Sequence, residues 1–162
     1  MNNTAPKQIT ESFRSSIRIY GDVFMRKEID INTWDRKEHF EFYSNIATPH
    51  YCVAFNIDIT KLLEFTRENK ISFYYSLIYF CTQSINEIDE FLLETEDNKV
   101  FKIDRRVPCF TDLKKGATSF HMVSLPCDGD IIEFATNARK ESENNPLSVY
   151  SLGGLRESQI VF

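Results

Sequence analysis

Apolar positions recur every three or four residues in four stretches of the chain, and this spacing predicts helices. Thr33 is a candidate N-cap for a helix over residues 34–46, which Pro49 would end. Thr60 is a candidate cap for a short helix in "TKLLEFTREN", and Asp128 or Asp130 for a late helix that begins near Ile131. A core helix is expected over "SFYYSLIYFCTQSINEI", with its apolar stripe at Tyr74, Leu77, Ile78, Cys81, Ile85 and Ile88.

Elsewhere apolar and polar residues alternate, which is typical of strands. The segment "YCVAFNIDIT" predicts a strand with one apolar face, formed by Tyr51, Val53, Phe55, Ile57 and Ile59. Two hairpins are expected, one around Asp97–Asn98 and one around Lys115–Gly116, and "SQIVF" predicts a strand at the end of the chain. Helices at the front, hairpins in the middle and a late helix together predict an α+β domain.

Composition refines this picture without changing it. The 162 residues are 42% hydrophobic and 27% charged, as expected for one globular domain. Fourteen Phe and seven Tyr either enlarge the core or line a pocket for a flat, partly apolar ligand. The net charge of −5 argues against nucleic acid as a partner, although the pairs Arg105–Arg106 and Lys114–Lys115 could each meet one small anion.

The cysteines and the N-terminus bear on the compartment. The four cysteines are far apart, with no C-x-x-C and no histidine at metal-ligand spacing, so we expect buried free thiols and no metal. The N-terminus "MNNTAPKQITESF" has no apolar core of a signal peptide, and no window approaches 18 uninterrupted apolar residues. These features predict a cytoplasmic protein without a membrane partner.

None of the three histidines forms a catalytic pattern with its sequence neighbours. His39 follows Glu38, but adjacent helical side chains point about 100° apart and do not face each other. His50 lies in a turn, and His121 lies in a predicted hairpin strand with no Ser, Cys or Asp beside it. The residues alone therefore predict an aromatic pocket with an unknown ligand.

Several consecutive blocks nevertheless have a familiar order and spacing. The blocks "TWDRKEHFEFY", "FNIDIT", "FYYSLIYFCTQSINEIDEF" and "CFT…F", between about Glu28 and Leu125, strongly resemble the N-terminal three quarters of chloramphenicol acetyltransferases. The resemblance implies an α+β two-layer sandwich of helices on a mostly antiparallel sheet, assembled as a homotrimer with active sites between subunits. It also implies that acetyl-CoA, a co-substrate rather than a bound cofactor, acetylates a hydroxyl of chloramphenicol or a similar antibiotic.

The resemblance further implies residues for the acceptor pocket. Those aligned with pocket positions of the family are Tyr43, Ala47, Pro49, Tyr51, Phe120, His121 and Met122. His121 and Met122 replace small residues of the family, which would narrow the pocket. Arg36 aligns with an arginine that pairs with an aspartate and supports the catalytic loop. Tyr75 stands where the family usually has proline, and we expect that change to affect only the entry into the helix.

The chain also departs from the family. The general base of the family lies in a motif H-H-x-x-x-D-G that this sequence lacks, so no catalytic residue is assigned. "ESQIVF" aligns with the strand before the oxyanion serine of the family. We therefore expect residues 29–162 to be a family domain without its C-terminal part, inactive alone, after an extension or flexible segment at 1–28. The alternatives are a non-catalytic small-molecule-binding module that keeps the aromatic pocket and, less favoured by the early aromatic residues, an acyltransferase acting on a lipoyl group.

Overall fold

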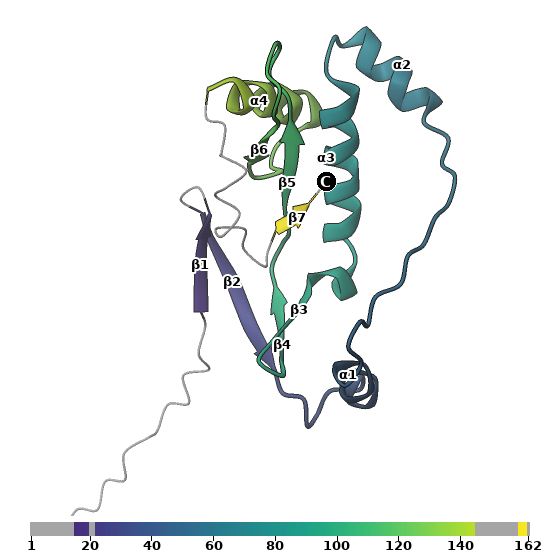
Figure 1. The fold of residues 1–162 in the computed structure, drawn as a ribbon, viewed down its shortest axis with the longest axis vertical. Coiled ribbons are helices and arrows are strands. Elements are labelled where there is room, and N and C mark those ends of the chain that lie inside the picture. The colour runs from purple at the N-terminus through teal and green to yellow at the C-terminus, as the bar shows by residue number, and fades with distance from the viewer. Residues whose placement is uncertain (1–14, 20–21, 145–158, 162) are drawn as a thin grey trace, which may run out of the picture.

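The computed structural model of the chain describes residues 15–19, 22–144 and 159–161 (Figure 1). Its helices are α1 (Lys37–Ser44), α2 (Thr60–Glu68), α3 (Phe73–Asn86), the short 3₁₀ helix η1 (Asp89–Leu92) and α4 (Ile131–Asn144). Its strands are β1 (Ser15–Ile19), β2 (Asp22–Ile29), β3 (Leu93–Glu96), β4 (Lys99–Ile103), β5 (Val107–Asp112), β6 (His121–Ser124) and β7 (Gln159–Val161). This element content confirms the predicted α+β class.

The strands form two sheets. The first has the order β1-β2-β4-β3 and is antiparallel throughout. The second has the order β6-β5-β7, with β6 antiparallel and β7 parallel to β5. Strand β2 pairs with β4 from Arg26 to Ile29, so its residues up to Glu28 lie inside the first sheet. Within the expected extension or flexible segment at 1–28, residues 22–28 are thus an ordered strand, and residues 1–14 and 20–21 lie outside the described part.

The predicted hairpin around Asp97–Asn98 is confirmed, because β3 and β4 pair up to Glu96 opposite Lys99. Both central residues are left-handed, with φ of 49° at Asp97 and 60° at Asn98. A two-residue turn of this kind needs positive φ at both positions, and Asp and Asn tolerate it better than other non-glycine residues. The second predicted hairpin joins β5 to β6, and Gly116 has a φ of 83° in its loop.

The core lies where α3 and α4 pack on β5 and β6 (Figure 1). Its buried members are Tyr75, Ile78, Phe110, Val123, Leu125, Cys127, Phe134, Ala135 and Ala138. Asp130, one of the two predicted caps, accepts the backbone N–H groups of Ile132 at 2.8 Å and Glu133 at 2.9 Å with Oδ1. This cap fixes the start of α4 over the core.

The core helix α3 forms as predicted and buries Ile78 of the predicted stripe, but its buried face is shifted from that stripe. Its buried residues are Tyr75, Ser76, Ile78 and Thr82, while Tyr74 and the following Ile88 are exposed. The prediction failed because apolar residues surround most of this helix, so their spacing does not single out one face.

Helix α1 begins at Lys37 rather than at residue 34, and Thr33 is not its cap. The Thr33 hydroxyl instead donates to the Asp30 carbonyl at 3.2 Å, within the turn that precedes the helix. Thr60 is not the cap of α2 either, because it is the first residue of that helix. Its N–H donates to Asp58 Oδ1 at 2.9 Å.

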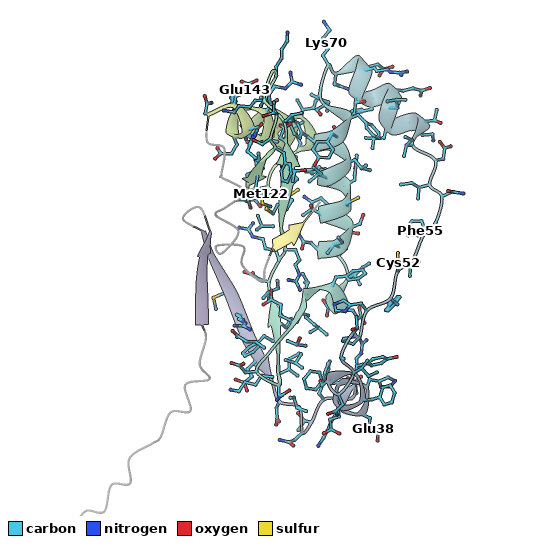
Figure 2. All side chains as sticks on the ribbon, viewed as in Figure 1. Glu38, Cys52, Phe55, Lys70, Met122 and Glu143 are labelled. Carbon is cyan, nitrogen blue, oxygen red and sulfur yellow. The ribbon has the colours of Figure 1, made fainter. Side chains whose placement is uncertain are left out.

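The predicted strand over residues 51–60 does not form. This segment runs from α1 to α2 on the outer side of α3, where Cys52 and Phe55 mark its course (Figures 1 and 2). Tyr51 is 89% exposed and Phe55 is 77% exposed. The alternation is suitable for a strand, but a strand also needs a neighbour for its backbone hydrogen bonds, and no described strand pairs with this segment.

A buried carboxylate links the two sheets. Glu94 of β3 is 7% exposed and accepts from Arg106 Nη1 at 2.8 Å, and Arg26 Nε of β2 lies 3.7 Å from its other oxygen. Arg106 stands between β4 and β5, and it also donates to the carbonyls of Phe91 and Leu93 at 2.8 Å each. The segment that leads from the first sheet into the second is thereby fixed.

A second polar junction joins α3, α4 and the end of β5. Tyr75 donates its hydroxyl to Asp112 Oδ2, and Ser142 of α4 donates to the same oxygen at 2.6 Å. Burial works to raise the pKa of Asp112, but the hydrogen bonds from Ser142, Tyr75 and the Leu113 N–H outweigh it and hold that pKa below its usual range. Burial, and then Asp112, raise the pKa of Tyr75 to about 12. Tyr75 therefore does more than affect the entry into the helix, which corrects the expectation from the sequence.

All four cysteines are free, with Cys109 and Cys127 buried and Cys52 exposed. Burial raises the pKa of Cys109 to about 11 and that of Cys127 to about 12, so these thiols stay protonated at neutral pH.

Replacing Glu94 with Gln should lower the free energy of unfolding by about 3 kcal/mol, because two arginines would lose a buried counter-charge. Glu28→Gln is the matched control, since Glu28 pairs with Lys99 on the surface at 3.2 Å and should contribute less than about 1 kcal/mol. Urea unfolding of both variants measures the difference. Equal losses in the two variants would contradict the role given to Glu94.

Tyr75→Phe should lower the free energy of unfolding by about 1–3 kcal/mol near neutral pH, because Asp112 loses a donor to its charged form. The pKa of Asp112 is lowered in the folded state, so its stabilisation is present above the ordinary value of 3.8 and lost as the pH falls below it. The loss caused by Tyr75→Phe should therefore shrink in acid.

The control is Tyr74→Phe, because the Tyr74 hydroxyl donates to the neutral Thr111 carbonyl at 3.0 Å. Its effect on unfolding should not change across the same pH range. The assignment fails if urea unfolding shows a loss for Tyr75→Phe that is equally independent of pH.

Candidate functional site

An open cavity of about 380 Å³ lies between the end of α1 and the turn of the β3–β4 hairpin. It is lined by Phe40, Tyr43, Ser44, Pro49, Thr95, Glu96, Asp97 and Asn98. Tyr43 and Pro49, two of the residues expected to bind the acceptor, thus lie on one cavity. The spacing of three residues between Phe40 and Tyr43 places both on the same side of α1, and the left-handed turn at Asp97–Asn98 forms the opposite wall.

The cavity combines aromatic surface with oxygen acceptors. Tyr43 is 52% exposed and packs edge-on against Phe42, with ring centroids 5.2 Å apart. Glu96 on the opposite wall binds Arg26 at 2.7 Å, which holds this carboxylate in place. An aromatic wall facing carboxylate and amide groups suits a small, flat ligand that carries hydroxyl or amide donors.

Arg36 is the N-cap residue of α1 and does not line this cavity. Its Nη2 donates to Glu90 Oε1 of η1 at 2.5 Å, and this hydrogen bond raises the pKa of Arg36 and lowers that of Glu90. The pair joins α1 to η1. Sequence reasoning did not identify this partner, because Glu90 lies 54 residues from Arg36 along the chain.

Two further residues of the expected acceptor set lie near the cavity but do not line it. Ala47 is exposed in the turn after α1, and Tyr51 belongs to the exposed segment that leads to α2. Neither contributes to the walls of the cavity as the structure describes them.

The remaining three residues lie in β6 and in the loop that precedes it. Met122 lies below α4, well away from Glu38 of α1 (Figure 2). Phe120 is 50% exposed, whereas Met122 and His121 are buried. The structure therefore does not bring Phe120, His121 and Met122 together with Tyr43 within one chain.

His121 contacts a serine rather than a cavity. Its Nε2 lies 3.0 Å from Ser142 Oγ, and Ser142 in turn donates its one hydroxyl hydrogen to the ionised Asp112. His121 must then be the donor to Ser142, so it does not accept a proton from this serine. The His121–Ser142–Asp112 series thus lacks the direction of proton transfer that an activated nucleophile needs.

Sequence reasoning missed this series because Ser142 lies 21 residues from His121 and 30 residues from Asp112, and the three residues belong to different elements. The one available signal was Tyr75 at a position where the family has proline.

The other histidines, His39 and His50, are exposed and do not line the aromatic cavity. Within the described ranges, no three His, Cys, Asp or Glu side chains gather to hold a metal ion. The same ranges contain no helix that is long and apolar enough to span a membrane.

Comparison with known proteins agrees with this geometry. The family model of chloramphenicol acetyltransferase matches residues 24–151. Chloramphenicol acetyltransferase 3 of Escherichia coli is 31% identical over 110 residues, covering 68% of this chain and 52% of that protein. Chloramphenicol acetyltransferase 2 of Escherichia coli is 29% identical over 134 residues, covering 82% of this chain and 63% of that protein.

The chain thus spans between half and two thirds of the length of these relatives. A solved chloramphenicol acetyltransferase structure has the same fold, with a TM-score of 0.74 at 21% identity over 85% of this chain and 68% of that one. The match of the family model extends from β2 to beyond α4, so it includes α1 and the cavity beside it as well as the β5–β6 hairpin. This chain belongs to the chloramphenicol acetyltransferase family.

Proposed function

We propose that the chain forms the acceptor-binding part of an acetyl-CoA-dependent O-acetyltransferase that acts on chloramphenicol or a similar hydroxylated antibiotic. The match of the family model over residues 24–151 carries this proposal. It is supported by the open cavity beside Tyr43, whose aromatic wall and facing oxygens suit a small ligand with an aromatic ring and hydroxyl groups.

Acetyl transfer needs a base for the acceptor hydroxyl and donors for the oxyanion that forms on the acetyl carbon. The sequence has three histidines, none of which borders the cavity: His39 and His50 are exposed, and His121 is bound to Ser142. We therefore infer that the 162 residues bind the antibiotic but do not acetylate it on their own.

The same observation favours a second function, that of a non-catalytic module which binds the antibiotic through its aromatic cavity. A turnover assay that follows the free thiol released from acetyl-CoA separates the two. Antibiotic-dependent release by a version extended to the length of the relatives would support the enzyme. Binding without release by that extended version would support the module.

We also propose a homotrimer with its acceptor sites between copies. Met122 lies well away from α1, which carries Tyr43, and none of Phe120, His121 and Met122 lines the aromatic cavity, so two copies would bring the two groups of acceptor-binding residues together. A ring of identical copies juxtaposes different surfaces of neighbours in this way. Arg36, which holds α1 against η1 through Glu90, supports one side of such a site.

In the cell, this function places the protein in the cytoplasm, where acetyl-CoA is available, and makes its product an inactivated antibiotic. The chain would thereby contribute to antibiotic resistance.

Tyr43→Ala should weaken chloramphenicol binding by about 1–3 kcal/mol, because the cavity loses its largest aromatic surface. Phe42→Ala is the control, since Phe42 is exposed beside Tyr43 but does not line the cavity. Calorimetric titration with chloramphenicol measures both. If the two variants bind as tightly as the parent protein, Tyr43 does not form the pocket.

A mixing experiment tests the site between copies. Tyr43→Ala and Phe120→Ala should each weaken binding when pure. After the two variants are unfolded and refolded together in equal amounts, about one quarter of the sites should combine an intact Tyr43 from one copy with an intact Phe120 from another. Titration of the mixture counts these tight sites. A site built within one chain predicts none, and that result would contradict the interface.

A further inference from the structure

A second pocket, of about 400 Å³, lies at the end of the domain away from the aromatic cavity. The loop after β5, the C-terminal half of α4 and the start of α3 form its walls. Its lining includes Tyr75, Asp112, Lys114, Lys115, Arg139 and Ser142. None of the residues assigned to the acceptor belongs to it.

The rim of this pocket is cationic. The Lys114–Lys115 pair comes from the loop, and Arg139 comes from α4, so two separate elements bring three positive charges together. Lys114 Nζ donates to the Glu143 carbonyl at 3.0 Å, which fixes the loop to the helix across the pocket. Lys115 and Arg139 are exposed and make no hydrogen bond or ion pair with any residue that the structure describes.

The floor of the pocket is polar, buried and already occupied by internal hydrogen bonds. Asp112 accepts from Tyr75, Ser142 and the Leu113 N–H, so both of its oxygens have donors. Ser142 and Tyr75 each donate their single hydroxyl hydrogen to this carboxylate, so neither can donate a hydrogen bond to a ligand. A bound molecule is therefore held by the three cations of the rim.

The charges around the pocket favour an anion. Lys114, Lys115 and Arg139 are opposed by the two carboxylates of Asp112 and Glu143, which leaves one net positive charge on a chain whose total is −5. The planar guanidinium of Arg139 matches the oxygens of a phosphate, and the flexible ammonium of Lys115 can reach the same group as a point charge. The limited volume admits a small molecule rather than a nucleic acid strand.

We propose that the pocket between α4 and the loop after β5 binds the phosphate group of a small molecule. Two sources offer this chemistry, namely a free phosphate monoester and the phosphates of coenzyme A. The pocket shares no lining residue with the aromatic cavity, although its Ser142 contacts His121, and its occupancy can be measured without acceptor or turnover. If the proposed acetyl transfer were disproved, the proposal of a phosphate site would therefore still stand.

The test is a titration of the complete chain with inorganic phosphate at constant ionic strength, followed by NMR of the backbone amides of residues 112–115 and 139–143. The chemical shifts of these amides should change with the phosphate concentration and reach a plateau, whereas chloride should not change them. Arg139→Gln should weaken phosphate binding about tenfold, and the double variant with Lys115→Gln should abolish it. Both side chains are exposed, so neither variant should change the fold.

Lys140→Gln is the matched control, because Lys140 is an exposed cation next to Arg139 that does not line the pocket. It should keep phosphate binding within about twofold, as expected for general screening alone. Displacement of phosphate by desulfo-coenzyme A would identify the coenzyme as the source, and its absence would identify a free phosphate ester. Unsaturable shifts, or equal weakening by Lys140→Gln and Arg139→Gln, would overturn the site.

Discussion

The buried Glu94 carboxylate is the interaction on which the arrangement of this domain depends. It lies in β3 of the first sheet, between Arg26 of β2 in the same sheet and Arg106, which stands where the chain passes into the second sheet. Two cations facing one desolvated carboxylate fix this passage far more strictly than apolar contacts, because a buried charge without its partner is costly. The relative position of the aromatic cavity at α1 and the hairpin loop at α4 follows from this junction.

That separation shapes the functional account. The cavity beside Tyr43 offers an aromatic wall and facing oxygens, but Phe120 is exposed away from this cavity, and His121 and Met122 are buried in β6. In the proposed assembly, a single copy would present two half-sites. In a symmetric assembly, each chain can contribute part of the site of its neighbour. Two small surfaces, one from each chain, can then enclose a small acceptor between them. In the proposed assembly, residues that lie apart in one domain would contact the same ligand.

Local patterns predicted most elements, and tertiary context decided the rest. Alternation and turn chemistry were sufficient for the β3–β4 hairpin, and Asp130 was recognisable as a cap. The segment from Tyr51 has the same alternation, yet it has no described strand beside it, and pairing is not encoded in its own residues. In the candidate site, family blocks pointed to Tyr43 and Pro49, whereas the Arg36–Glu90 pair and the Asp112 junction join distant positions that no local pattern connects.

A crystal structure of the chain with chloramphenicol bound tests the central claim most directly. The account predicts that the antibiotic lies between two copies, with its ring against Tyr43 of one copy and within contact of Phe120 of its neighbour. An antibiotic bound wholly within one copy, or against neither residue, would contradict both the assigned pocket and its position between chains.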